Sequence, residues 1–163
     1  MKVLGIDPGT AACGYGLVHE SEGRLRAIVF GAWRTPPRQR VELRLKTIFD
    51  GVDGLIEEHA PDTVVLEESF VGADARTALS VGQARGAVLV ACARGGVEAA
   101  EYAPNRVKQM ICGYGHADKS QVQRMVKIVL GLQEPPHPDH AADALAVAVC
   151  HTLAPPLLRM AEA

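Results

Sequence analysis

The order of the strand-like and helical segments constrains this chain more than any other feature of its sequence. Residues 2–7 form a short apolar run, and residues 14–19 and 24–33 alternate apolar and polar side chains. Such patterns are typical of β-strands, and turn-forming residues at 8–9 and 20–23 separate the three segments. We therefore predict that the chain begins with three antiparallel strands joined by tight turns.

The rest of the chain alternates between strand and helix patterns. Two apolar or β-branched runs are too short for helices and predict strands at 63–67 and 97–102. Apolar residues at helical spacing predict helices at 41–59, 75–93, 104–111, 119–130 and 140–153. Three antiparallel strands followed by alternating strands and helices predict an α/β fold, with a five-stranded mixed sheet and helices on both faces.

The length of 163 residues fits a single domain, which we assign to residues 1–154, followed by a C-terminal tail at 155–163. The longest apolar runs are far shorter than the roughly 20 residues of a membrane-spanning helix, and Asp7 interrupts the N-terminal run before it could serve as a signal peptide. Four cysteines lie far apart and form no C-x-x-C pair: Cys13, Cys92, Cys112 and Cys150. We expect buried free thiols, no membrane partner and a cytoplasmic location.

The charged residues are strongly segregated along the chain. A net charge of −2 argues against nucleic acid as a partner, because nucleic-acid-binding domains are usually basic. However, residues 24–46 hold seven basic residues and one acidic, residues 47–74 hold eight acidic and none basic, and residues 104–130 hold five basic and one acidic. This distribution predicts a bipolar surface with basic regions that could bind phosphates.

Three carboxylates lie in unusually apolar surroundings. Asp7 and Glu67 each end a predicted strand, and Asp143 is the one charge in the apolar segment 141–148. A carboxylate in such a place must be paired, desolvated or metal-bound, and together the three predict a divalent-cation site. Taken singly, Asp7 could cap a turn, Glu67 and Asp143 could form ion pairs, and the neighbouring Glu68 could replace Glu67.

Six segments carry a resemblance to a known family, in the expected order along residues 2–153. They are 3–10 (VLGIDPGT), 66–70 (LEESF), 82–86 (GQARG), 102–109 (YAPNRVKQ), 119–123 (KSQVQ) and 140–146 (HAADALA). Together they resemble the RuvC Holliday-junction resolvases. The resemblance implies a ribonuclease H-like fold, a homodimer and metal-dependent cleavage of four-way DNA junctions in recombination and repair, with 5′-phosphate products.

The resemblance also implies the identity of the catalytic residues. Asp7, Glu67 and Asp143 match three family acids, which would hold two Mg²⁺ or Mn²⁺ ions per subunit. The fourth family ligand falls on His140, although Asp139 lies one place earlier and i,i+4 spacing would also serve. We interpret Asp139 as the helix cap and His140 as the ligand. An imidazole ligand is compatible with transition metals, so Mn²⁺ should support activity at least as well as Mg²⁺.

Several further residues match family positions that contact DNA. The basic residues that flank the carboxylates in the family pattern are Arg106, Lys108, Lys119, Arg124 and Lys127. Of these, Lys119 matches a family lysine that could contact the scissile region or its neighbouring phosphates, unless it is an exposed lysine at a helix start. It joins the predicted catalytic set. Phe70 resembles an aromatic residue that stacks on a junction base, unless it is a core residue. Tyr114 is a weaker candidate, and the basic block 24–46 is either a second DNA surface or a solvated face.

A four-way junction has two-fold symmetry, which suits a dimer with two identical sites. The small residues of the predicted helix 75–93 favour it as the dimer contact, although they could also serve packing within one subunit. The family also implies a junction-migration helicase as partner.

Three rival interpretations remain at this point. The segment 3–10 resembles the first phosphate loop of actin-like ATPases, which are commonly more than twice this length. The chain could also be a catalytically silent nucleic-acid-binding module, or a nuclease that acts on RNA or on other branched DNA.

Overall fold

The five strands form one mixed sheet in the order β3-β2-β1-β4-β5. The protein is seen here as a computed structural model that describes residues 1–68 and 75–161. β1 (Lys2–Asp7), β2 (Ala12–Ser21) and β3 (Arg24–Arg34) pair antiparallel, as predicted. β4 (Thr63–Glu67) and β5 (Glu98–Tyr102) extend the sheet in parallel from β1. The predicted five-stranded mixed sheet is therefore confirmed.

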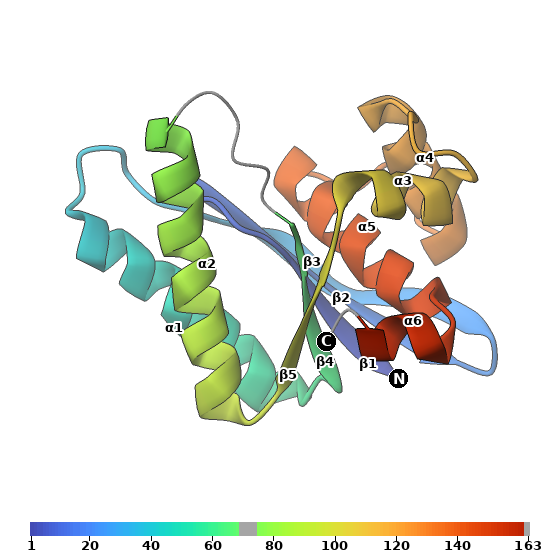
Figure 1. The fold of residues 1–163 in the computed structure, drawn as a ribbon, viewed down its shortest axis with the longest axis horizontal. Helices are drawn as coiled ribbons and strands as arrows, with labels where there is room; N and C mark the ends of the chain where they lie inside the picture. Colours follow the sequence, from blue (N-terminus) through green and yellow to red (C-terminus); the bar gives the residue numbers. More distant parts are fainter. Residues whose placement is uncertain (69–74, 162–163) are drawn as a thin grey trace.

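Helices cover both faces of this sheet (Figure 1). On one face lie α1 (Val41–His59) and α2 (Ala75–Gly95). On the other face lie α3 (Pro104–Cys112), α4 (Lys119–Leu130) and α5 (Asp139–Leu153). As predicted, α1 ends at His59, and Pro61 follows after Ala60 takes a left-handed conformation.

The two central strands are apolar along their length because helices bury both of their sides. Val3 and Val65 belong to the core cluster shared with α3, α4 and α5. Leu4 and Val64 belong to the cluster shared with α1 and α2. All four side chains are fully buried, so the sheet divides the interior into two hydrophobic cores.

Glycines let α5 lie unusually close to β1 and β2. They are Gly5 in β1 and Gly14 and Gly16 in β2. A Cβ atom at Gly5 would overlap the backbone carbonyl oxygen of Ala144, and one at Gly14 would overlap that of His140. The close approach sets the position of the N-terminal half of α5, which carries part of the functional site described below.

The C-terminal tail expected from the sequence contains a helix, α6 (Pro156–Ala161). Leu158 packs partly buried against the core cluster of α3, α4 and α5. The Arg159 Nη1 atom donates a hydrogen bond to the Met1 sulfur at 3.0 Å, so α6 lies against the start of β1. A segment of six residues is too short to show a helical periodicity in the sequence.

All four cysteines are free thiols, and Cys13, Cys92 and Cys150 are buried, as predicted, whereas Cys112 is partly exposed. Among the described residues, no helix combines the length and apolar character needed to span a bilayer.

Candidate active site

The site begins at the carboxyl ends of β1 and β4. These strands are parallel neighbours, and Ile6 pairs with Leu66, so the next residues, Asp7 and Glu67, emerge side by side at one edge of the sheet. Glu67 lines a pocket there, whereas Glu68 is exposed and its amide donates to the Tyr102 carbonyl at 2.9 Å. The structure thus brings Glu67, rather than Glu68, to Asp7.

The N-terminal turns of α5 bring two more predicted residues to this edge. His140 Nδ1 lies 2.7 Å from Asp7 Oδ2, a contact that spans 133 residues of sequence. Asp143, one turn further along the same helix, lines the pocket beside Glu67. Asp7, Glu67, His140 and Asp143 are therefore gathered from three elements into one site.

Asp139 differs from its predicted role as the helix cap. Pro138 occupies the N-cap position, without a side-chain cap hydrogen bond, and Asp139 is the first residue of the helix. Its carboxylate instead lies 3.5 Å from Lys119 Nζ and 3.3 Å from the Gln123 amide nitrogen. Asp139 therefore contacts residues of α4, and His140 is the α5 residue that contacts Asp7.

Lys119 is placed by a well-formed helix start. Asp118 caps α4 in a capping box with Gln121, and Lys119 is the first residue after the cap. Its Nζ atom lies 2.9 Å from Asp143 Oδ2. The ammonium group therefore lies within the acidic site.

Burial and mutual repulsion perturb the charges of the site. Burial, together with repulsion from the nearby Asp7 and Asp143 carboxylates, raises the pKa of Glu67 to about 7. Burial also raises the pKa of Asp7, although the hydrogen bond from His140 partly opposes this. Partial burial works against the Lys119 ammonium, but its contacts with Asp143 and Asp139 outweigh this and raise its pKa. Such perturbed carboxylates are typical of functional sites.

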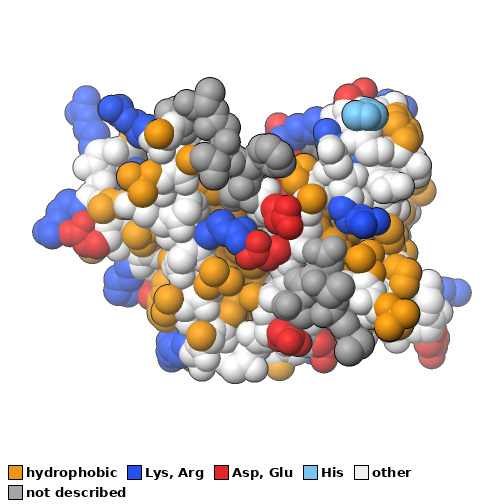
Figure 2. Space-filling view, viewed as in Figure 1, with side chains coloured by type: hydrophobic (Ala, Val, Ile, Leu, Met, Phe, Trp, Pro, Cys, Tyr) orange, Lys and Arg blue, Asp and Glu red, His pale blue; other side chains and the backbone are white. Residues whose placement is uncertain are grey.

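These charged side chains line a pocket of about 270 Å³. Its charged residues are Glu67, Lys108, Lys119 and Asp143, and its apolar wall comes from α3, α4 and α5. Figure 2 shows acidic side chains in the middle of this face of the molecule, with basic side chains on either side of them. A pocket with this mixture attracts a cation at its centre and phosphates at its rim.

A second depression, of about 430 Å³, has His140 among its lining residues. The loop after β1 forms one wall, and Arg44, Arg76 and Thr77 contribute basic and hydroxyl groups. Thr35 ties this region together, because its hydroxyl donates to the Thr10 carbonyl and accepts from Arg44 Nε at 2.8 Å. Sequence reasoning placed Arg44 in a basic block but gave no signal that it lines the same depression as His140.

Arg85 of α2 supports the end of β4. It forms an ion pair with Glu101 of β5, and its Nη1 atom lies 3.4 Å from the backbone carbonyl oxygen of Glu67. Both charged side chains are partly buried. The sequence motif 82–86 contained Arg85, but nothing in it indicated this contact with the site.

Of the five predicted basic DNA contacts, two line the acidic pocket. Lys108 and Lys119 line the acidic pocket. Arg124 lines a separate small pocket with Tyr114, Arg106 is exposed on α3, and Lys127 lies in the last turn of α4. Phe70 lies outside the described residues.

The side chains of the site are chemically suited to bind a divalent cation. Carboxylate oxygens and imidazole nitrogen are ligands of Mg²⁺ and Mn²⁺. As placed, however, no three such side chains in residues 1–68 and 75–161 form a group ready to hold an ion. Instead, Asp7 pairs with His140, and Asp143 pairs with Lys119. Binding an ion would therefore require these side chains to exchange their partners for it.

Glu67→Gln should stabilise the metal-free protein at alkaline pH. Because the pKa of Glu67 is about 7 in the folded state and 4.5 otherwise, its contribution to stability falls as the pH rises from about 4.5 to 7. The neutral amide avoids this loss, and we expect a gain of about 1–2 kcal/mol at pH 8, after allowance for solvent screening, and almost none at pH 5. Chemical denaturation with a chelator measures the difference. Glu68→Gln is the matched control, and an equal effect in both variants would contradict the assignment.

Comparisons with known proteins agree with this architecture. Residues 3–151 match the family of the crossover junction endodeoxyribonuclease RuvC. RuvC of Moorella thermoacetica is 54% identical over 151 residues, which cover 93% of this chain and 90% of that protein. The Thermus thermophilus RuvC structure is 39% identical, with a TM-score of 0.89 over 99% of this chain and 98% of that one. The same protein in complex with Holliday junction substrate gives a TM-score of 0.91 at 38% identity, over 99% and 97% of the two chains.

The strand order, the helices on both faces and the acidic edge of the sheet define an enzyme with a ribonuclease H-like fold. The two alternative classes, an ATPase and a silent binding module, do not fit the extent of these matches, which cover nearly the whole chain. The chain belongs to the RuvC family of crossover junction endodeoxyribonucleases.

Proposed function

We propose that the protein resolves four-way DNA junctions by paired symmetric nicks in homologous recombination and DNA repair. Membership of the RuvC family supports the reaction, and a 38% identical relative has been solved with its Holliday junction substrate. The observation that carries the proposal is the convergence of Asp7, Glu67, His140 and Asp143 at one edge of the sheet. We also propose that it acts in the bacterial cytoplasm, where chromosomal DNA would be its substrate.

Two divalent ions per subunit, Mg²⁺ or Mn²⁺, would be held by these four residues, with Asp7 shared between them. When bound, such ions activate the attacking water and stabilise the departing 3′ oxygen, which gives 5′-phosphate and 3′-hydroxyl ends. The raised pKa of Glu67 supports this assignment, because a buried carboxyl group gains most from a nearby cation. In the described structure His140 Nδ1 contacts Asp7, and binding of the ions would replace this contact.

Lys119 would exchange its carboxylate partner for DNA. In the described structure its ammonium neutralises Asp143 at 2.9 Å. A cation at Asp143 would release Lys119 toward the phosphates next to the scissile bond. Lys108, on the same pocket, is placed for a similar phosphate contact. Arg106, Arg124 and Lys127 would contact DNA further away, and Phe70 would stack on a junction base.

Mn²⁺ should support cutting at least as well as Mg²⁺, because His140 adds an imidazole to the carboxylate ligands. The test is cleavage of a mobile four-way junction beside a linear duplex of the same sequence, with each metal in turn. Cutting of the junction alone, with Mn²⁺ equal or superior, is the expected result. Clearly superior Mg²⁺ would contradict the ligand assignment, whereas equal cutting of linear DNA or RNA would contradict the substrate.

Helix α2 is the proposed contact of a homodimer. Its outer face combines exposed Leu79 and Val90, 66% and 60% accessible, with Gly82 and Gly86, where a Cβ atom would meet nothing within 4 Å. Exposed apolar residues beside glycines favour close approach of a second helix. A dimer would present two sites to the two-fold junction. A junction-migration helicase, implied by the family, is the further proposed partner.

Val90→Glu should convert this dimer to a monomer, because it places two like charges in an apolar contact. Light scattering after size-exclusion chromatography measures the mass. Ile128→Glu, on α4, is the matched control, since Ile128 is 62% exposed on another face. A dimeric Val90→Glu variant, or a wild-type monomer at micromolar concentration, would rule out this interface.

A further inference from the structure

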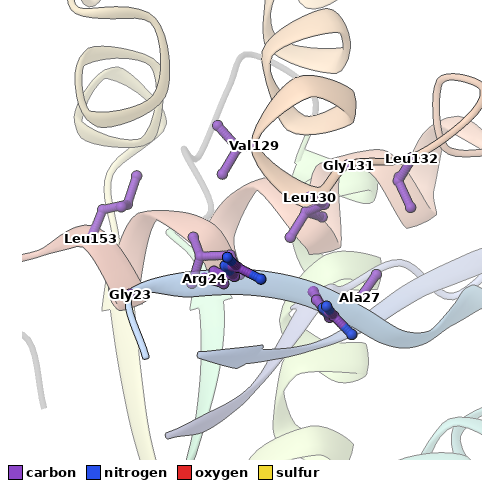
Figure 3. Close-up of a pocket in the computed structure, with 10 residues that line it drawn as sticks. Gly23, Arg24, Ala27, Val129, Leu130, Gly131, Leu132 and Leu153 are labelled. Carbon is purple, nitrogen blue, oxygen red and sulfur yellow. The ribbon is translucent and has the colours of Figure 1, made fainter. Parts of the chain in front are cut away.

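A groove of about 770 Å³ lies at the end of the sheet opposite the acidic site. Figure 3 shows it between the start of β3, the end of α4 and the end of α5. The strand pairing gives its position, because Lys2 is opposite His19, which is opposite Arg26 on the groove, whereas Asp7 is opposite Gly14. Asp7 lies five positions after Lys2 in β1, so the acidic site and the groove are roughly 17 Å apart along the strand.

The groove combines an apolar floor with two cations. Leu25, Ala27, Val129, Leu132 and Leu153 supply the apolar lining. Arg24 and Arg26 are the only charged residues that line it. Both are exposed, and neither forms an ion pair or side-chain hydrogen bond within residues 1–68 and 75–161. Such a lining suits a ligand with carboxylate groups beside apolar ones.

The wall of the groove is also an open sheet edge. β3 is the outermost strand, so part of its backbone N–H and C=O groups point away from β2. A bulge interrupts its pairing between Val29 and Ala27, where Ile28 is the extra residue. Bulges limit further strand addition, which confines the available edge to residues 24–27, the segment that borders the groove.

We infer that this groove binds an extended segment of another protein, rich in Asp or Glu and apolar residues, which adds as a short strand to β3 at residues 24–27. Backbone hydrogen bonds from the edge would supply affinity, and alternate side chains would enter the apolar floor and meet Arg24 and Arg26. This inference goes beyond the proposed nuclease function and does not depend on it.

Two other occupants fit the groove less well. A second copy of the chain that paired through the same edge would bring its own Arg24 and Arg26 against these two, and like charges on facing strands destabilise the pairing. A DNA backbone would leave the apolar floor unused, because phosphates need cations rather than Leu and Val side chains.

The position of the groove gives such a partner a direct relation to the site. Helix α4 runs from Lys119 at the site to Leu130 at the groove, and α5 runs from His140 to Leu153. A segment bound in the groove therefore contacts the far ends of the two helices that carry site residues. It also leaves the acidic edge open to DNA.

Peptide display with the full-length protein tests the inference. A library of random 12-residue peptides is selected on the wild type and counter-selected on Arg24→Glu/Arg26→Glu. We expect enrichment of peptides in which Asp or Glu alternates with apolar residues, and at least tenfold weaker binding of those peptides to the variant. The matched control, Arg38→Glu/Arg40→Glu, makes the same charge change outside the groove and should bind them like the wild type.

Amide exchange and chemical shifts locate the bound peptide. An added strand should protect backbone amides within residues 24–27 and shift the signals of 129–132. The inference is overturned if no acidic peptide is enriched, if enriched peptides bind both double variants equally, or if the protected amides lie elsewhere. It is also overturned if a linear duplex, or higher protein concentration alone, shifts these same signals, because the groove would then hold DNA or a second copy.

Discussion

Asp7→Asn should abolish junction cutting, by at least about 10³-fold, while junction binding remains. Asp7 is the carboxylate that links the β1 end to His140 at 2.7 Å, and it lies beside Glu67 and near Asp143. A neutral amide is a much weaker ligand than a carboxylate, so the proposed site would lose the group that its two ions would share. Because the substitution removes a negative charge from the DNA-facing site, binding of the phosphate backbone should be equal or tighter.

The measurement compares single-turnover cutting with junction affinity at one salt concentration. Asp50→Asn is the matched control, since Asp50 is an exposed carboxylate of α1 that pairs with Lys46 at 2.5 Å. This control should cut like the wild type. Residual cutting by Asp7→Asn within tenfold of the wild type would show that Asp7 is not the shared ligand. Loss of binding together with cutting would instead indicate a general defect in the site.

The sequence was sufficient to predict the sheet and three of the four site residues, because their signals are local. An apolar run that ends in Asp7 or Glu67 indicates a buried strand with a carboxylate at its edge. The position of the fourth residue depends on tertiary structure. Spacing allowed either Asp139 or His140, and it is the pairing of Asp139 with Lys119, and of His140 with Asp7, that separates them.

Contacts between distant segments were not predictable for the same reason. Arg85 approaches the Glu67 carbonyl only because α2 packs along the sheet, and Arg44 lines the same depression as His140 only because of the fold. A single sequence does not indicate which distant residues contact one another. The groove at β3 is a further case. It forms where the start of β3 meets the ends of α4 and α5, and its lining residues extend over about 130 residues of sequence.

Charge segregation along the chain also has a different meaning in three dimensions. The acidic block 47–74 contributes residues to α1 and β4 and includes Glu67 of the site. Two of its eight acidic residues, Asp53 and Glu57 of α1, pair with Arg94 of α2. The basic block 24–46 is divided between the groove, where Arg24 lies, and the depression beside His140, where Arg44 lies. The net charge of −2 therefore conceals at least three separate electrostatic regions.

Gly14→Ala should be among the most destabilising single-atom additions in the protein, and it should impair catalysis as well. The new methyl group would overlap the His140 carbonyl oxygen and lie near its Cβ atom, so α5 must move away from β2. Overpacking against backbone costs about 2–3 kcal/mol, or roughly 5–10 °C in Tm for a chain of this size. Since Asp7 is the strand partner of Gly14, the same movement separates His140 from Asp7.

Gly54→Ala in α1 is the control that distinguishes a close approach from a general effect of alanine. A Cβ atom at Gly54 meets nothing within 4 Å, and alanine favours a helix over glycine by about 1 kcal/mol. Gly54→Ala should therefore keep or raise the Tm and cut junctions normally. Thermal unfolding and junction cutting of both variants measure the contrast. A Gly14→Ala protein with unchanged Tm and rate would mean that α5 does not rest on the β2 backbone, and the placement of His140 and Asp143 would then need another cause.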